Sequence, residues 1–294
     1  MSKVKVAVLG SGNIGSDLMM KLRRAKNLQL TTVIGIDPNS DGLKRAKEYG
    51  YITFEKGIDD FLQHLELADI VFDATGAKAH IRHAKLLKEA GKRVIDLTPA
   101  AVGPFVVPTV NLEEHENEDN VNMVTCGGQA TTPIVHAMNC VQPISYAEVI
   151  ATVSSRSAGP ATRANINEFI ETTNKALETI GGAKKGKTVL IINPAEPPII
   201  MRDTIHALFE GETIDKEAIV KAIYDAEKKV QAYVPGYRIR TEPIFDGNQV
   251  TILIEVEGAG DYLPKYAGNL DIITAASVQV AEQWAAKIIA NSAV

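Results

Sequence analysis

The feature that most limits the possible folds of this 294-residue chain is a glycine-rich turn, Gly10-Ser11-Gly12-Asn13-Ile14-Gly15. Before it, residues 3–9 alternate polar and apolar side chains and end in Val8 and Leu9, as a strand entering a buried sheet does. After it, residues 16–25 carry a helical pattern. A second apolar strand, residues 30–37, ends in Asp37 about 20 residues beyond the last glycine. Together these features predict a dinucleotide-binding βαβ unit.

The positions of this fingerprint have separate physical roles. Gly10 permits the tight turn, Gly12 lets the backbone approach a pyrophosphate, and Gly15 lets helix and strand pack closely. The Asp37 carboxylate accepts hydrogen bonds from a ribose 2′-hydroxyl and repels a 2′-phosphate, which predicts NAD rather than NADP. The alternative is a purely structural strand–turn–helix in which the glycines fall by chance.

Strands and helices continue to alternate through the first half of the chain. We expect strands at residues 51–54, 70–74 and 93–96, and helices at residues 39–49, 58–65 and 77–90. This order predicts a parallel sheet with ligands beyond the carboxyl ends of its strands. Thr75-Gly76 and residues 98–101 occupy such ends, so we expect them to flank the nicotinamide.

Two histidines, His80 and His83, lie three residues apart on the helix expected at residues 77–90. This spacing is compatible with a pair of metal ligands. No cysteine or carboxylate neighbours them in the sequence, so we expect solvent-facing structural side chains and no metal site.

A cysteine follows the last apolar strand of this half, residues 121–124. Gly127 and Gly128 come next, and Thr131-Thr132-Pro133 predicts the start of a helix. The helix dipole is expected to lower the pKa of the Cys126 thiol, and the glycine amides to receive an oxyanion. The alternative is that Cys126 is a small buried hydrophobic residue. Its place at the nicotinamide edge of the sheet favours a reactive thiol.

The second half has a different pattern, with strands expected at residues 146–154, 188–193, 198–206, 237–245 and 249–257. Helices are expected at residues 165–180 and 215–233, and Asp246-Gly247-Asn248 predicts a hairpin turn. This is an α+β pattern with a mostly antiparallel sheet and helices on one face. A helix at residues 271–290 is expected to return to the nucleotide domain. We therefore expect a Rossmann domain at residues 1–130, completed by residues 270–294, and a substrate and dimerisation domain at residues 131–269.

Several further residues are candidates for chemistry in the second half. The loop at residues 154–165 is rich in hydroxyls, carries Arg156 and Arg163, and suits phosphate or nicotinamide contact, although an ordinary connection has a similar composition. Asp203 lies in an otherwise apolar strand, so it is either paired with an arginine or has a raised pKa and acts as a base. His206 and His136 are competing bases. Cys140, at the end of an apolar helix, is expected to pack in the core.

Composition excludes some classes of function. The net charge of -5 and the lack of a basic tract argue against nucleic acid as a partner. Two cysteines do not make a disulfide framework, which predicts a reduced, cytoplasmic setting. The first residues do not have the pattern of a signal peptide, and no stretch reaches membrane-spanning length.

Eight sequence motifs, which are spread in order over nearly the whole chain, resemble those of the acetylating acetaldehyde dehydrogenases. This is the type that partners 4-hydroxy-2-oxovalerate aldolase in meta-cleavage pathways of aromatic catabolism. The motifs are Gly10-Ser11-Gly12-Asn13-Ile14-Gly15, Ile95-Asp96-Leu97-Thr98-Pro99-Ala100-Ala101, residues 121–128, Ser157-Ala158-Gly159-Pro160, Asn193-Pro194-Ala195-Glu196-Pro197-Pro198, Met201-Arg202-Asp203-Thr204, Ala232-Tyr233-Val234-Pro235-Gly236-Tyr237 and Tyr266-Ala267-Gly268-Asn269-Leu270-Asp271.

The resemblance implies a glyceraldehyde-phosphate-dehydrogenase-like architecture and oxidation of acetaldehyde, with propionaldehyde as a second substrate. It implies NAD as cofactor, coenzyme A as co-substrate, Cys126 as the acyl-thioester residue and Asp203 as proton acceptor. It also implies a homodimer, or a hetero-tetramer with the aldolase. The NAD contacts that it implies, beside those at residues 11–14, are Ser157, Ala158, Gly159, Pro160, Ala161, Thr162, Arg163, Ala164, Asn165 and Asn269.

The chain departs from the family pattern at two places. Ala161 stands where glycine is usual, and the turn at residues 246–248 is shorter than in many relatives. Two rival functions are a phosphorylating or semialdehyde dehydrogenase of the same architecture and a non-enzymatic NAD-binding sensor.

Overall fold

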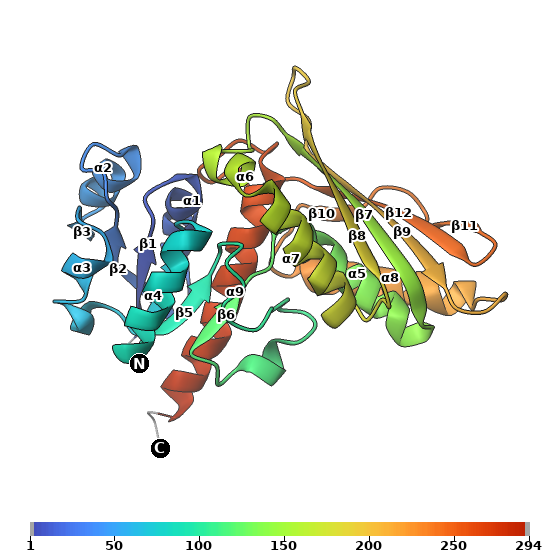
Figure 1. The fold of residues 1–294 in the computed structure, drawn as a ribbon. Coiled ribbons are helices and arrows are strands. Elements are labelled where there is room, and N and C mark those ends of the chain that lie inside the picture. The colour runs from blue at the N-terminus through green and yellow to red at the C-terminus, as the bar shows by residue number, and fades with distance from the viewer. Residues whose placement is uncertain (1–2, 292–294) are drawn as a thin grey trace. The chain divides into compact units, whose positions relative to one another are not determined.

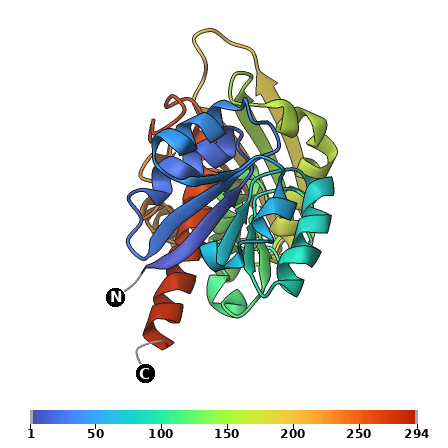
Figure 2. The ribbon, with the colours of Figure 1, turned by 90° about the vertical axis from the view of Figure 1, so that its left-hand side faces the viewer.

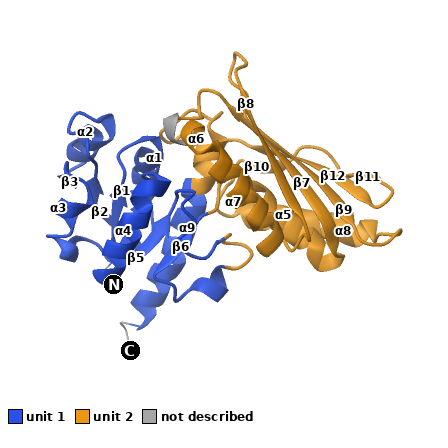
Figure 3. Cartoon of the chain, in the orientation of Figure 1, with its two compact units in different colours: residues 1–106, 112–123, 274–294 blue, residues 107–111, 124–273 orange. Residues whose placement is uncertain are grey.

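The computed structural model describes residues 3–291, and for Pro160 and Ala161 only the course of the backbone. The chain forms two compact units (Figure 3). Unit 1 comprises the chain up to residue 106, residues 112–123 and the chain from residue 274 onward. Unit 2 comprises residues 107–111 and 124–273.

Unit 1 is built on a six-stranded sheet in which every pair of neighbouring strands is parallel. The strand order, β3-β2-β1-β4-β5-β6, is that of a dinucleotide-binding sheet (Figure 2). Its strands are short and apolar because both faces are covered. They are β1 (Val4–Leu9), β2 (Leu28–Ile34), β3 (Ile52–Phe54), β4 (Ile70–Asp73), β5 (Arg93–Asp96) and β6 (Asn120–Asn122).

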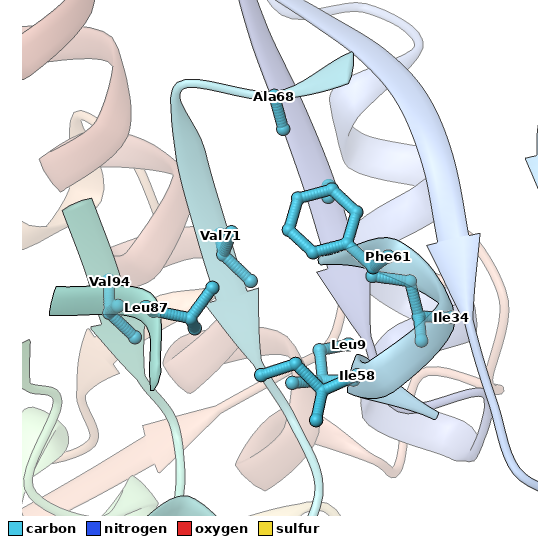
Figure 4. Close-up of a cluster of buried hydrophobic side chains, with 9 residues drawn as sticks. Leu9, Ile34, Ile58, Phe61, Ala68, Val71, Leu87 and Val94 are labelled. Carbon is cyan, nitrogen blue, oxygen red and sulfur yellow. The ribbon is translucent and has the colours of Figure 1, made fainter. Parts of the chain in front are cut away.

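Helices cover both faces of this sheet. They are α1 (Asn13–Leu22), α2 (Asp41–Glu48), α3 (Ile58–Phe61) and α4 (Ala77–Glu89), with short 3-10 helices at Leu65–Leu67 and Leu112–His115. Leu9 on β1 packs in a cluster with Phe61 of α3 and Leu87 of α4 (Figure 4). Val8, the preceding residue, points to the other face, where Gly15 of α1 approaches it closely. The sheet is therefore buried on both sides.

The last helix, α9 (Gly268–Asn291), ends in unit 1. Its Trp284 is fully buried and lies against the Arg93 guanidinium, which is 3.5 Å from the ring centroid. Glu282 accepts from the backbone amide of Lys26 at 2.6 Å. These contacts join the end of the chain to the first sheet. Within residues 3–291 no helix, α9 included, is long and apolar enough to cross a membrane.

Unit 2 contains a mixed sheet in the order β10-β12-β9-β7-β8, with β11 paired to β12 (Figure 1). The β7–β8 pair is parallel and the other pairs are antiparallel, which confirms the predicted fold class. The expectation of one strand at residues 237–245 is wrong: two strands form, separated by a segment that includes Pro243, which has no amide for a ladder. The strands are β7 (Ile144–Ser154), β8 (Gly186–Asn193), β9 (Met201–Phe209), β10 (Tyr237–Ile239), β11 (Ile244–Asp246) and β12 (Gln249–Val256).

One face of this sheet packs against helices. The helices of unit 2 are α5 (Cys126–Val141), α6 (Pro160–Ala164), α7 (Ile166–Thr179) and α8 (Lys216–Gln231), and α5 contacts β7, β9 and β12 (Figure 1). Burial alternates along β9, so Asp203 and Ile205 point to the helices, whereas Arg202 and Leu208 point to the opposite, open face.

Candidate active site

The central thiol lies at the first residue of a long helix. Helix α5 begins at Cys126 itself, so the predicted start at Thr131–Pro133 is wrong. Thr125 is the N-cap, and its hydroxyl accepts from the Gly128 amide at 2.9 Å. Pro133 lies inside the helix, where it supplies no N–H to the backbone ladder. The two glycines thus belong to the first helical turn and not to a loop.

The backbone that precedes this turn is strained. Val124 has a φ of 59°, in the left-handed region that β-branched residues rarely adopt. The Thr125 hydroxyl is also 2.7 Å from the Thr173 hydroxyl, which donates to the Phe169 carbonyl at 2.7 Å. Strain of this kind persists only where the surroundings impose it, and it is concentrated at functional sites.

The amides of the first turn divide into two groups. The Gly128 amide donates to the cap, so the expectation that it would receive an oxyanion is wrong. The amides of Cys126 and Gly127 instead act on the Cys126 sulfur, where they lower its pKa by hydrogen bonding. These two N–H groups are the donors available for negative charge at the thiol.

Asp203 is buried on β9 with only 1% of its surface exposed. Its Oδ1 accepts from the Thr152 amide at 3.3 Å, and its Oδ2 has no hydrogen-bond partner among the described residues. Arg202 points to the open face, where its Nε lies 3.0 Å from Glu255 Oε2. The two alternatives for Asp203 were an ion pair with an arginine and an unpaired carboxyl with a raised pKa, and the second is therefore the correct one. Burial raises its pKa well above the ordinary value, and the Thr152 amide opposes this shift.

The thiol and this carboxyl lie close together. A Cβ added to Gly127 would be 3.3 Å from the Ala151 Cβ, and Ala151 is the register partner of Asp203 on the neighbouring strand. Burial, followed by the Asp203 charge, raises the pKa of the Cys126 thiol to about 12. The expectation of a lowered thiol pKa is wrong, because desolvation outweighs the helix amides.

Neither competing histidine faces this pair. His206 lies on the open face of the sheet, with its Nδ1 2.9 Å from the Thr251 hydroxyl. His136 is ten residues along α5 from Cys126, about 15 Å at the helical rise. Its Nε2 lies 3.4 Å from the sulfur of Cys140, which is exposed, so the expectation that Cys140 packs in the core is wrong.

The glycine turn of unit 1 borders a cavity of about 450 Å³. Gly10 has a φ of 119°, and a Cβ there would be 2.6 Å from the Ala74 carbonyl oxygen. A Cβ at Gly15 would be 1.8 Å from the Gly10 carbonyl oxygen, whereas one at Gly12 would meet no atom within 4 Å. The cavity is lined by Leu9, Gly10, Ser11, Gly12, Ile34, Gly35, Ile36, Gly57, Ala74, Thr75, Gly76, Ala79 and His83.

The other predicted cofactor residues of unit 1 lie around this turn. Helix α1 begins at Asn13 with Gly12 as N-cap and no side-chain cap, while Ile14 is half-buried. The Ser11 hydroxyl is 2.9 Å from the Ser40 hydroxyl. Strand β2 ends at Ile34, earlier than predicted, and Asp37 is exposed, accepting from the Asn39 amide at 2.9 Å. The turn thus has the shape that a pyrophosphate requires.

Thr75 is held by an aspartate that also binds both helix histidines. Asp73 Oδ1 accepts from the Thr75 amide at 3.1 Å and from its hydroxyl at 2.5 Å. Asp73 Oδ2 lies 2.9 Å from His80 Nδ1 and 2.8 Å from His83 Nδ1. Both histidines are buried, so the expectation of solvent-facing side chains is wrong. Across the described residues no cluster of histidine, cysteine and carboxylate side chains is arranged to hold a metal ion.

The remaining predicted cofactor residues lie in unit 2, in the segment that follows β7 and, for Asn269, at the start of α9. The Ser157 hydroxyl donates to the Ser154 carbonyl at 3.0 Å, and Arg163 turns back to the Ala158 carbonyl at 3.0 Å. Asn269 donates to the Ser157 carbonyl at 3.4 Å, and its buried Oδ1 has no partner in the described part of the chain. Gly159 is the N-cap of α6, which contains Thr162, ends at Ala164 and has Asn165 as its C-cap. Pro160 and Ala161 lie outside the residues whose side chains are described.

Comparison with known proteins first gives the class of fold. Residues 5–118 match the family described as semialdehyde dehydrogenase, NAD binding domain. The solved structure of aspartate semialdehyde dehydrogenase II complexed with ASA, from Vibrio cholerae, matches with a TM-score of 0.66 at 14% identity. The match covers 96% of this chain and 98% of that chain, so the fold is that of the semialdehyde dehydrogenases.

Sequence similarity then narrows the class to a family. Residues 126–264 match the family described as prokaryotic acetaldehyde dehydrogenase, dimerisation. The acetaldehyde dehydrogenase of Geobacillus stearothermophilus is 69% identical, with 97% of each chain covered. That of Brevibacillus brevis is 64% identical, with 98% of each chain covered. The chain belongs to the prokaryotic acetaldehyde dehydrogenases, which are NAD-binding oxidoreductases, and the resemblance inferred from its sequence is confirmed.

Proposed function

We propose that this protein oxidises acetaldehyde with NAD and transfers the acetyl group to coenzyme A through a thioester on Cys126. The observation that carries the proposal is the pairing of a helix-terminal thiol with a buried carboxyl whose Oδ2 is unpartnered within residues 3–291. The aldehyde is taken from the names of the relatives, which are acetaldehyde dehydrogenases. Propionaldehyde, one methylene longer, is the second candidate.

The first step is proton transfer from the thiol. A pKa of about 12 keeps Cys126 neutral at pH 7, so attack on a carbonyl requires a base beside it. Asp203 meets this requirement, because its raised pKa gives it a greater affinity for a proton than an exposed aspartate has. The pair carries one negative charge before and after the transfer, so no second charge has to be buried.

The attack forms a thiohemiacetal on Cys126. Its oxyanion is stabilised by the amides of Cys126 and Gly127, which lie at the positive end of α5. NAD, when bound, would supply the acceptor for the hydride that leaves the former aldehyde carbon. The open space beside Gly12 fits a pyrophosphate, and the unpartnered Oδ1 of Asn269 fits an amide donor such as that of nicotinamide. The carbonyl re-forms and leaves an acetyl-thioester on Cys126.

The second step is acyl transfer. The thiol of coenzyme A attacks the acetyl carbon and gives up its proton to Asp203, which has released the first proton to solvent. The bond from the acetyl carbon to Cys126 Sγ breaks, and the proton on Asp203 returns to the departing thiolate. Covalent catalysis thereby separates the oxidation from the acyl transfer.

The choice of acceptor tests this function. With acetaldehyde and NAD, we expect sustained NADH formation when coenzyme A is present and at most one turnover per active site when it is absent. Turnover supported by inorganic phosphate instead would identify a phosphorylating dehydrogenase. Binding of NAD with no NADH formed under any condition would identify a cofactor sensor. The measurement is absorbance of NADH in parallel reactions.

We also propose that unit 2 mediates self-association in a reduced cytoplasm and that the protein partners 4-hydroxy-2-oxovalerate aldolase in aromatic catabolism. The open sheet face carries exposed Ile191 and Leu208, and the family match over this unit is to a dimerisation domain. Light scattering should give a dimer mass for the protein alone, and a larger complex with the aldolase. A monomer that stays unaltered on mixing would contradict both associations.

A further inference from the structure

A buried cluster of ionisable side chains lies at the carboxyl ends of β4 and β5 in unit 1. Asp73 ends β4, Asp96 ends β5, and His80 lies in the first turns of α4 between them. His80 Nδ1 is 2.9 Å from Asp73 Oδ2, and its Nε2 is 3.2 Å from Asp96 Oδ2. All three side chains are fully buried, so both ring nitrogens of His80 are used inside the protein.

His83 belongs to the same cluster but is placed differently. Its Nδ1 is 2.8 Å from Asp73 Oδ2, and His83 is also one of the residues that line the cavity beside the glycine turn. The histidines around Asp73 hold the pKa of that carboxyl well below its usual range, so Asp73 is an ionised acceptor. Nδ1 of His83 therefore donates to Asp73, which leaves Nε2 as the nitrogen available to a ligand in the cavity.

Nε2 of His83 differs in chemistry from the rest of the cavity lining. Among the described residues that line it, His83 is the only one with a titratable side chain, and the others are glycine, alanine, aliphatic residues, Ser11 and Thr75. A cavity of this kind binds most of a ligand through apolar and backbone contacts and orients it through few polar groups. Gly10 and Gly12 of the turn lie along the same cavity.

We propose that His83 contacts the ADP half of the dinucleotide through a hydrogen bond at Nε2, with Asp73 holding the ring in place. The inference rests on the NAD binding included in the proposed function. Asp73 also fixes Thr75, so one carboxylate positions two residues of the cofactor pocket. His80 is a structural member of the cluster, because neither of its ring nitrogens is left for a ligand.

Two substitutions of His83 distinguish the proposed hydrogen bond from Nε2 to the ligand from the structural role of Nδ1, which binds Asp73. Asparagine at position 83 keeps a donor near the Nδ1 position and loses the Nε2 position, whereas glutamine keeps a polar atom near Nε2. We expect His83→Asn to weaken binding of NAD and of ADP equally, by about tenfold, the equivalent of one hydrogen bond. His83→Gln should weaken binding less than His83→Asn does. The exposed His64, changed to Asn, is the matched control and should leave both affinities unaltered.

The experiment measures the dissociation constants of NAD and ADP by calorimetry, with kcat at saturating NAD. A raised KM for NAD with unchanged kcat is expected for His83→Asn. Equal affinities in the wild type and His83→Asn, or stronger binding by His83→Asn than by His83→Gln, would overturn the contact. A wild-type protein that binds neither NAD nor ADP would overturn the proposed function together with it.

A measurement on the unaltered protein covers the case in which His83→Asn does not fold. The chain has six histidines, so their ring nitrogens can be followed by long-range proton–nitrogen spectra. Addition of ADP should shift the Nε2 resonance of His83, assigned with His83→Gln, and leave that of His64 in place. An Nε2 resonance of His83 that ADP leaves unshifted would overturn the contact.

Discussion

Replacing Cys126 with alanine is expected to lower kcat for coenzyme A-dependent oxidation of acetaldehyde by at least about three orders of magnitude. The reason is that the Cys126 sulfur lies beside the first-turn amides of α5 and is the proposed carrier of the acyl group. NADH formation under saturating aldehyde, NAD and coenzyme A is the measurement. Binding of NAD should be retained, because the glycine turn that we propose to hold the pyrophosphate lies in the other unit.

The chain contains its own control for this substitution. Cys140 is the second free cysteine, is exposed, and lies on the same helix with its sulfur 3.4 Å from His136 Nε2. Cys140→Ser should keep activity within about twofold of the wild type, as surface substitutions usually do. If Cys126→Ala keeps substantial turnover, or if Cys140→Ser loses it, the nucleophile has been assigned wrongly.

Replacing Asp203 with asparagine is expected to lower kcat/KM at neutral pH by about 10² to 10⁴, the usual contribution of a general base. Asparagine has nearly the same shape but cannot accept the thiol proton. His206→Gln is the matched control, because it lies on the same strand with its side chain on the opposite face. The account is contradicted if His206→Gln shows the larger loss or if Asp203→Asn has normal turnover.

The pH dependence of the reaction rate follows from the direction in which the pKa of Asp203 is shifted. Its pKa is raised, so the wild-type rate should fall with decreasing pH at values well above 3.8, the ordinary pKa of an aspartate. In Asp203→Asn this limb should be replaced by a rate that stays low at neutral pH and increases only at alkaline pH, because only the thiolate fraction of Cys126 then supports attack. Initial rates across the pH range measure both profiles, and identical profiles would exclude Asp203 as the base.

Alkylation of Cys126 gives an independent check on the same pair. The Asp203 charge contributes to the high pKa of the thiol, so Asp203→Asn should move the alkylation profile of Cys126 to lower pH. The measurement belongs in a Cys140→Ser background, because the exposed Cys140 would otherwise be modified as well. A thiol that is neutral at rest is also protected from oxidation until a substrate enters.

Loss of activity in Asp203→Asn should not reflect unfolding. An acid whose folded pKa is raised loses stability as pH increases from its unfolded pKa to its folded pKa, because the folded state binds the proton more tightly. Asparagine is uncharged, as protonated Asp203 is, so the substitution removes the loss of folding stability that ionisation of the buried carboxyl causes. The Tm of the variant at neutral pH should therefore equal or exceed that of the wild type.

Local sequence patterns were sufficient to predict much of the fold. The Gly10–Gly15 turn and the alternation of strands and helices depend on residues near one another, and both predicted the parallel sheet correctly. Thr131-Thr132-Pro133 resembles a helix start and predicts the wrong beginning for α5, because the helix is capped earlier, by Thr125. The sequence does contain a signal for the true helix start, because Thr125 lies three residues before Gly128, and its hydroxyl accepts from the Gly128 amide.

The errors about side chains arose from long-range contacts. His80 and His83 have no acidic neighbour in the sequence, but the parallel topology brings Asp73 and Asp96 to them from two strand ends. The thiol of Cys126 has the helix position that lowers a pKa, yet packing against β7 and β9 raises it. Such reversals depend on burial, which local sequence does not define.

The most direct test of the central claim is the intact mass of the protein after reaction with acetaldehyde and NAD in the absence of coenzyme A. We predict a mass increase of one acetyl group, located on Cys126 by peptide mapping, absent in Cys126→Ala and removed when coenzyme A is added. No adduct in a wild-type protein that has formed NADH, or an adduct that survives in Cys126→Ala, would contradict it.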